Sequence, residues 1–247
     1  MAKYSAKDAV ILIKGYNFST YATSFEVEQG VNPIDVTGFG DGCKNFIRGP
    51  LTATIRADML WDSTAAKVHA ALYNPAAVNG HVTILPQGYA LGNSSISLPF
   101  QQGNYNPKGG VNDAISVGTI QFMSYGASTE GVEWGNVLAH ATITNTTTGT
   151  GYQVNSDAVT SRCAATLHIW SACAADTYVV KVQHCATVDG SYGDLLTFTA
   201  NGSAITSERQ TAASGTINKF IRVLATRTGS AGNSFGYTVH YWQATLG

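Results

Sequence analysis

The residue types that carry out enzyme chemistry are present in this chain, but their spacing matches no catalytic or metal-binding pattern. The four cysteines include no C-x-x-C pair, so the strong zinc and redox signatures are missing. These cysteines are Cys43, Cys163, Cys173 and Cys185. None of the six histidines belongs to an H-E-x-x-H or comparable motif. We therefore expect free thiols and packed imidazoles, with no metal site and no cofactor.

One short string matches a nucleophile motif. Residues 232–236 read G-x-S-x-G, which exposes its serine only in a strand, turn and helix context. Here the string leads into residues 235–242, whose alternation is typical of a strand, and no acidic residue follows it. The string is therefore predicted to be a hairpin turn, and the protein is predicted not to be an enzyme.

The composition excludes further classes of function. The 247 residues include 14 Lys and Arg and 15 Asp and Glu, so only 12% of residues are charged. A dedicated nucleic-acid-binding protein needs a cationic surface, which a net charge of −1 does not supply. No stretch reaches the roughly 20 apolar residues that span a bilayer. We expect no membrane partner and synthesis in a host cytoplasm, since residues 9–13 are too short for a signal-peptide core.

The elements that would position any site are mainly β-strands. Apolar and polar residues alternate with a period of two, most clearly over residues 51–59. The same pattern predicts further strands at residues 9–13, 21–29, 82–85, 96–100 and 114–124. A slip in the alternation near Gly118 indicates a β-bulge. One helix is predicted, over residues 63–73, and Pro75 ends it.

The residue composition and the strand pattern change near residue 135. Residues 145–151 form a run of Thr and Gly, after which short strands alternate with turn signals. That spacing is typical of a small β-sandwich. We therefore expect two domains, residues 1–135 and residues 136–247.

A long segment between two predicted strands lacks a burial pattern. It covers the nineteen residues 32–50 and includes the glycine-rich residues 38–42. These glycines do not have the G-x-G-x-x-G spacing of a phosphate-binding loop, and no helix follows them. Because loops of this length in compact domains are usually functional, the segment is the first candidate site.

This segment and its surroundings resemble the signature region of phage major tail proteins, the tail tube proteins of long non-contractile tails. The similar runs are I-D-V-T-G-F-G-D at 34–41 and K-N-F-I-R-G-P-L at 44–51. Further similar runs are N-F-S-T-Y at 17–21, L-P-Q-G at 85–88, V-K-V-Q-H at 180–184, D-G-S-Y-G-D-L at 189–195 and K-F-I-R-V at 219–223. Arg48 stands where the family usually has Pro, and Pro50 is an insertion, so the loop is expected to differ locally.

The resemblance implies a mainly β fold: a tail-tube-like β-barrel or sandwich domain with one short helix, then a second small β-sandwich-like domain. It implies a structural virion protein that forms stacked rings, trimeric or hexameric, around a channel for genome delivery. The implied partners are copies of itself, other tail proteins such as the tape measure and tail terminator, and double-stranded DNA that passes without specific binding. Residues 136–247 could complete the channel wall as a diverged tube unit or decorate its exterior, and both alternatives stay open.

Two groups of candidate residues follow. DNA has to slide through a channel without being held, which favours carboxylates and neutral polar groups over Lys and Arg in the lumen. Glu26, Glu28 and Asp58 lie on polar faces of predicted strands and are the predicted channel-lining residues. The predicted ring-stacking residues are Thr37, Gly38, Phe39, Gly40, Asp41, Phe46, Ile47, Arg48 and Gly49.

Two other classes of protein fit the same composition. A capsid decoration or cement protein would also be β-rich, low in charge and non-enzymatic, but it would attach to a shell. A carbohydrate-binding module would present an exposed, coplanar aromatic platform. The candidates for such a platform are Trp170, Tyr237, Tyr241 and Trp242.

Overall fold

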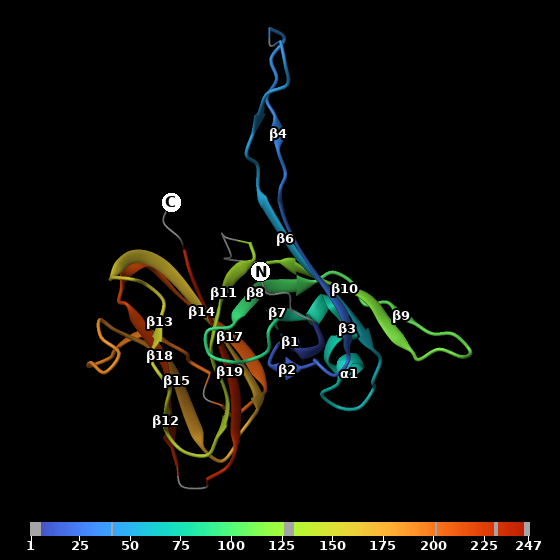
Figure 1. The fold of residues 1–247 in the computed structure, drawn as a ribbon. Coiled ribbons are helices and arrows are strands. Elements are labelled where there is room, and N and C mark those ends of the chain that lie inside the picture. Colours follow the sequence, from blue (N-terminus) through green and yellow to red (C-terminus); the bar gives the residue numbers. More distant parts are fainter. Residues whose placement is uncertain (1–5, 41, 126–130, 201, 230–231, 245–247) are drawn as a thin grey trace. The chain divides into compact units, whose positions relative to one another are not determined.

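The computed structural model describes residues 6–40, 42–125, 131–200, 202–229 and 232–244. These residues form a mainly β fold of antiparallel strands with one short α-helix, which confirms the predicted fold class (Figure 1). The sheets are open within the described ranges, with no closed barrel. The chain divides into two compact units. Unit 1 comprises residues 1–20, 80–97 and 134–247, and unit 2 comprises residues 21–79 and 98–133.

Unit 1 contains the predicted β-sandwich. Four strands of the largest sheet lie here side by side in the order β17-β14-β19-β11. These strands are β11 (Glu133–Ile143), β14 (Val159–Ser171), β17 (Thr206–Ile217) and β19 (Phe235–Gln243). The second sheet consists of β12 (Thr147–Thr148), β13 (Tyr152–Gln153), β15 (Thr177–Cys185), β16 (Gly193–Thr197) and β18 (Phe220–Thr228). Side chains from both sheets, among them Leu167, Tyr178 and Phe235, are fully buried in one apolar cluster.

The N-terminal strands also belong to unit 1. They are β1 (Val10–Ile13) and β2 (Tyr16–Asn17), after the short 3-10 helix Ala6–Asp8. Unit 1 also contains β7 (Asn79–Leu85) apart from its first residue, and the beginning of β8 (Ser94–Gln102). β1 pairs with β2 and with β7. Lys14 and Gly15 form the two-residue turn between β1 and β2, and both have positive φ, as a type I′ hairpin requires. A Cβ at Gly15 would lie 2.5 Å from the Thr206 backbone oxygen, so this turn packs directly against β17.

Unit 2 is organised around β3 (Ala22–Val31), β6 (Leu51–Leu60) and β10 (Ser116–Ser124), with β9 (Pro107–Lys108) beside β10. On β6 the predicted alternation holds, because Ala53, Ile55, Ala57 and Met59 are all buried. The predicted bulge is also present: the register of β10 shifts between Val117 and Ile120.

The predicted helix over residues 63–73 is shorter in the structure. Helix α1 covers only Val68–Leu72, and a 3-10 turn, Pro75–Ala77, follows it. Ala66 has φ +64°, in the left-handed region, and this conformation interrupts an α-helix. Val68 and Leu72 are buried, as the predicted apolar stripe requires.

The two units are interleaved along the chain. The chain leaves unit 2 for the last time after residue 133 and continues in unit 1 from residue 134, next to the division predicted near residue 135. Residues 1–20 and 80–97 nevertheless share a unit with residues 134–247. The assignment of residues 1–135 to a tail-tube-like domain and of residues 136–247 to a C-terminal β domain therefore stays a prediction. No helix in the described part of the chain is long and apolar enough to cross a membrane.

Candidate functional site

Within the segment predicted to be a long loop, the described residues 32–40 and 42–50 form a β-hairpin that projects from the sheet of unit 2 (Figure 1). We call residues 32–50 the hairpin arm. Its strands β4 (Ile34–Asp35) and β5 (Phe46–Ile47) pair antiparallel. At its base the Asn32 amide donates to the Pro50 carbonyl at 3.1 Å. The arm therefore continues the β3–β6 pair outward as a two-stranded hairpin.

A polar cluster fixes the point where the ribbon gives way to its glycine-rich tip. Asp35 Oδ1 accepts hydrogen bonds from the Thr37 amide at 2.9 Å and from the Thr37 hydroxyl. The Thr37 hydroxyl oxygen in turn accepts the Asn45 amide at 2.9 Å. The bonds from Thr37, led by its hydroxyl, hold the pKa of Asp35 below its ordinary value. Asp35 therefore orients the Thr37 hydroxyl, and it is this hydroxyl that bonds across the hairpin to Asn45.

Large apolar side chains on the arm face solvent. Ile34 and Ile47 are cross-strand partners, so they point to the same face, and each exposes about half of its surface. Phe46 on the opposite face is 54% exposed, and Phe39 at the tip is fully exposed. A two-stranded hairpin is at best marginally stable alone in water. Exposed apolar surface of this kind is typical of a protein–protein contact.

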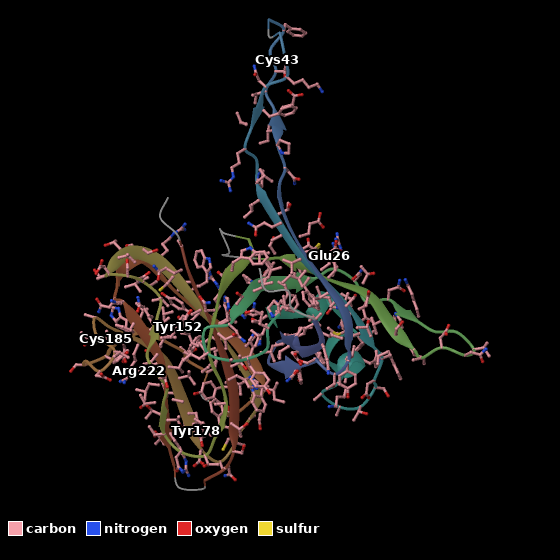
Figure 2. All side chains as sticks on the ribbon, viewed as in Figure 1. Glu26, Cys43, Tyr152, Tyr178, Cys185 and Arg222 are labelled. Carbon is pink, nitrogen blue, oxygen red and sulfur yellow. The ribbon has the colours of Figure 1, made fainter. Side chains whose placement is uncertain are left out.

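The structure brings the described ring-stacking candidates together on this one projection. Thr37, Gly38, Phe39, Gly40, Phe46, Ile47, Arg48 and Gly49 all lie on the arm. Asp41, the remaining candidate, lies outside the described residues. Gly49 is required by close approach of the strands, because a Cβ there would lie 1.9 Å from the Asn32 oxygen. Figure 2 places Cys43 at the far end of the arm, where it is exposed and unbonded.

The channel-lining candidates share the polar face of β3 and β6, where Figure 2 labels Glu26. Arg56 Nη1 lies 3.2 Å from Glu26 Oε2 and 2.7 Å from Glu28 Oε2. The two carboxylates raise the pKa of Arg56 above its ordinary value. Ion pairs this exposed contribute little to stability, because water screens them. The main consequence of these ion pairs is that Glu26 and Glu28 neutralise the positive charge of Arg56 on this face.

Asp58 has a structural contact set. Its carboxylate accepts the Ser24 hydroxyl at 2.7 Å and the backbone amide of Thr119 at the β10 bulge. The bond from Thr119, then that from Ser24, lowers the pKa of Asp58, and the charge of Lys108 acts in the same direction. Asp58 therefore joins β3, β6 and β10. Sequence patterning placed Arg56 and Asp58 on one polar face of their strand. It did not predict the contacts of Arg56 with Glu26 and Glu28 or the charge of Lys108 near Asp58, since cross-strand register is not visible in one strand.

The rings nominated as a sugar-binding platform are not exposed together. Tyr237 and Tyr241 are buried, at 3% and 2% exposure, because they point into the core of the sandwich. Trp170 instead lies in a stack, 5.3 Å from the ring of His140, which itself stacks on Tyr89 at 4.3 Å. That interpretation of the aromatic residues was wrong, because alternation along β19 places the two tyrosines on its inner face.

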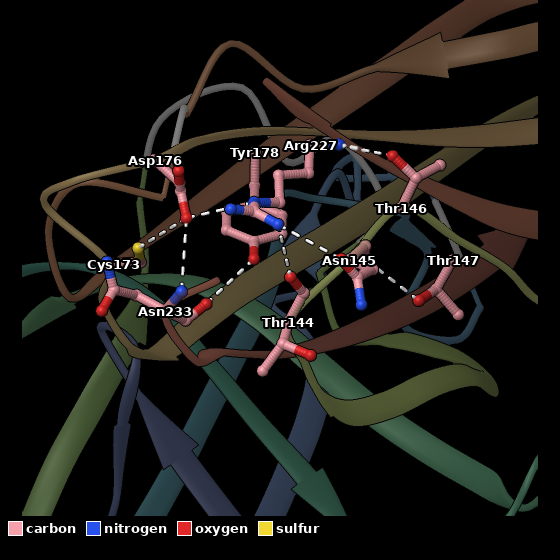
Figure 3. Close-up of polar contacts among 9 residues, drawn as sticks. All are labelled: Thr144, Asn145, Thr146, Thr147, Cys173, Asp176, Tyr178, Arg227 and Asn233. Atoms are coloured by element: carbon pink, nitrogen blue, oxygen red, sulfur yellow. Dashed lines mark hydrogen bonds and ion pairs between the residues drawn. The ribbon is translucent and has the colours of Figure 1, made fainter. Parts of the chain in front are cut away.

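A buried ion pair holds one end of the sandwich in unit 1 (Figure 3). Asp176 Oδ2 accepts Arg227 Nε at 3.1 Å and the Asn233 amide at 3.3 Å. Arg227 Nη1 also donates to the Thr144 backbone oxygen at 3.0 Å. The pair thus links the segments that precede β15, β19 and β12. The role of this ion pair is structural.

Three cysteines of unit 1 are buried free thiols, as expected: Cys163, Cys173 and Cys185. Within the described ranges no cluster of His, Cys, Asp or Glu is placed to hold a metal ion.

Comparison with known proteins finds similarity only among solved structures. No family model matches the chain, and no curated protein matches it. The tail of an empty gene transfer agent particle is 15% identical, covers 51% of this chain and 96% of its own, and has a TM-score of 0.41. The virion of a native gene transfer agent is 14% identical, with coverages of 53% and 98% and a TM-score of 0.42.

A third similar structure is the Dit protein of phage SPP1, described as a hub adsorption apparatus. It is 10% identical, covers 96% of this chain and 99% of its own, and has a TM-score of 0.36. These three structures are described as a tail, a virion and a phage adsorption hub. At these TM-scores and identities the likenesses assign no function to the chain.

Proposed function

We propose that this protein is a structural component of a phage-like tail, and that it is the subunit of the tail tube. Copies of the chain join into rings, trimeric or hexameric, and the rings stack into a tube for genome delivery. The observation that carries this proposal is the hairpin arm, which presents Ile34, Ile47 and Phe39 to solvent. Such a projection gains burial only against another molecule, and a repeated contact between copies generates a filament.

In this proposal the hairpin arm makes the ring-to-ring contact. The variant to test carries Phe39→Ser and Ile47→Ser, which remove exposed apolar area from the arm. A matched control carries Val111→Ser and Ile115→Ser, two exposed residues outside the arm, at 102% and 49% exposure. We expect the arm variant to sediment as single rings or subunits, while the control forms tubes like the unaltered chain. Tubes of ordinary length and yield from the arm variant would refute the stacking role.

The second part of the proposal is that Glu26, Glu28 and Asp58 face the channel. The contact between Arg56 and two glutamates supports it, because a neutralised guanidinium is poorly placed to hold passing phosphates. Virions carrying Glu26→Lys are expected to eject DNA more slowly than virions carrying Asp113→Lys, the same charge change on an exposed residue of unit 2. Equal ejection rates for the two variants would remove Glu26 from the channel wall.

The proposed partners are therefore copies of the chain, the tape measure and tail terminator proteins, and DNA in transit, and the proposed location is the virion tail. The same sedimentation experiment separates the alternative. A capsid decoration or cement protein stays unpolymerised alone and co-sediments with capsid shells. Whether residues 136–247 complete the wall or decorate the exterior is decided by their radial position in reconstructed tubes.

A further inference from the structure

A cleft of about 200 Å³ opens on unit 1 and includes no residue of the two candidate surfaces described above. Three segments of unit 1 supply its walls: the start of β11, the chain just after β13, and the end of β19. The lining residues are Trp134, Gly135, Asn136, Val154, Asn155, Tyr241, Gln243 and Ala244. Pockets for drug-sized ligands measure roughly 300–1,000 Å³, so this cleft suits one small ring.

The cleft combines one exposed aromatic ring with fixed amides. Trp134 exposes 58% of its surface, although it is the largest kind of aromatic side chain. Beside it, Asn155 and Gln243 are joined reciprocally: Gln243 Nε2 donates to Asn155 Oδ1 at 3.1 Å, and Asn155 Nδ2 donates to Gln243 Oε1 at 3.4 Å. The Tyr241 hydroxyl also donates to Gln243 Oε1, at 3.1 Å, and holds that amide in place.

The reciprocal pairing leaves hydrogen-bonding capacity in the cleft. A primary amide has two N–H donors and a carbonyl oxygen that accepts two bonds. The contacts above use one N–H on each amide, so Asn155 and Gln243 each retain one donor, and Asn155 Oδ1 retains one acceptor site. A preorganised donor beside an acceptor matches a pair of adjacent hydroxyl groups, each of which both donates and accepts.

The charge of the cleft narrows the class of ligand. None of the eight lining residues has a side chain that ionises near neutral pH, and burial raises the pKa of the Tyr241 phenol further above its ordinary value. A phosphate or carboxylate would therefore lose hydration without meeting a cation. An uncharged ring with polar edges and an apolar face would enter the cleft without losing the hydration of a charged group.

We propose that this cleft binds the ring of a neutral hexose. The C–H face of the sugar stacks on the Trp134 ring, whose π-face is electron-rich. Two neighbouring hydroxyls of the sugar then bond to the free donor and acceptor sites of Asn155 and Gln243. This recognition is independent of tube formation.

The test is saturation-transfer difference NMR on the full-length protein. The probes are the methyl glycosides of glucose, galactose, mannose and N-acetylglucosamine, with glucose 6-phosphate as a charged competitor. We expect millimolar binding of at least one neutral sugar, with the strongest transfer to its ring C–H protons and weaker binding of the phosphate. Trp134→Ala should weaken binding at least tenfold. Tyr73→Ala, which removes an equally exposed ring (59%) from unit 2, should leave it unchanged.

The thermal midpoint of each variant is measured to check that it is folded. A second control is Trp134→Phe, which keeps an aromatic face and should retain sugar binding. Asn155→Ala should also weaken binding, because it breaks the amide pair. Absence of saturation transfer to all four neutral sugars overturns the proposal. Equal binding by the unaltered chain and Trp134→Ala does so too. Loss of self-assembly in Trp134→Ala, without sugar binding by the unaltered chain, assigns the cleft to a subunit interface and likewise overturns it.

Discussion

Acid should unfold unit 1 well before it titrates most carboxylates, because three buried or half-buried histidines lie there as neutral imidazoles. His168 and His240 have no exposed surface, and His81 is half-buried. The Gly15 amide donates to His168 Nδ1 at 3.2 Å, so Nδ1 is the unprotonated nitrogen and Nε2 donates to the Thr83 hydroxyl at 2.8 Å. Protonation at Nδ1 would break the first bond and place a charge among neutral groups.

Burial is the main cause of the lowered histidine pKa values. The pKa falls to about 4 for His81 and to about 3 for His240, and it lies well below the ordinary value for His168. The charge of Arg209 lowers the first two further, and that of Glu208 opposes the shift at His81. Each folded-state pKa lies below the unfolded value of about 6.5, so stability is fully present above that pH and falls as the pH decreases.

The magnitude follows from linkage. Between pH 7 and pH 5, each imidazole with a folded pKa of about 4 or lower removes about 2 kcal/mol of unfolding free energy. His81 and His240 alone then remove about 4 kcal/mol, a large part of the roughly 5–15 kcal/mol that stabilises a typical domain. Unit 1 should therefore become marginal near pH 5.

The assay is hydrogen exchange of the β14 and β19 amides, which reports on unit 1 alone, at several pH values after correction for intrinsic exchange rates. His81→Gln should reduce the loss of opening free energy between pH 7 and pH 5 by about 2 kcal/mol, because one titrating group is gone. Comparing variant with unaltered chain cancels the contribution of the carboxylates. An unaltered chain that loses less than about 1 kcal/mol over this range would refute the reasoning.

Three further predictions concern single substitutions, each measured by denaturant unfolding. Asp176→Asn should destabilise unit 1 by about 3–5 kcal/mol, because it leaves a buried arginine without its partner, whereas Asp194→Asn, at an exposed ion pair, should cost about 0–1 kcal/mol. Gly15→Ala should destabilise more than Gly232→Ala, since both have positive φ but only at Gly15 would the Cβ meet backbone atoms closer than 3 Å. Arg56→Gln should leave the denaturant midpoint nearly unchanged, because the ion pairs are exposed, and should increase the negative charge of the β3–β6 face. Equal costs within either matched pair, or a large cost at Arg56, would contradict these assignments.

Local patterns predicted local structure well. Alternation along residues 51–59 identified the buried face of β6, and the slip near Gly118 located the bulge in β10. The helix was overextended because side-chain periodicity does not report a single left-handed residue such as Ala66. The arm was taken for an irregular loop because a two-stranded ribbon exposed on both faces has no burial pattern.

Long-range arrangement was the part that sequence could not supply. Residues 1–20 and 80–97 belong with residues 134–247, and nothing local marks them as partners. The contact of the Gly15 amide with His168 joins positions 153 residues apart. The neighbours of Glu26 and Asp58 depend in the same way on strand register, so their residue types were predictable and their contacts were not.

The most direct test of the proposed function is electron microscopy of the purified full-length protein at increasing concentration. The account predicts rings and stacked tubes with a continuous central channel, in which the hairpin arm contacts the adjacent ring. A protein that remains monomeric at every concentration, with no rings and no tubes, would contradict it.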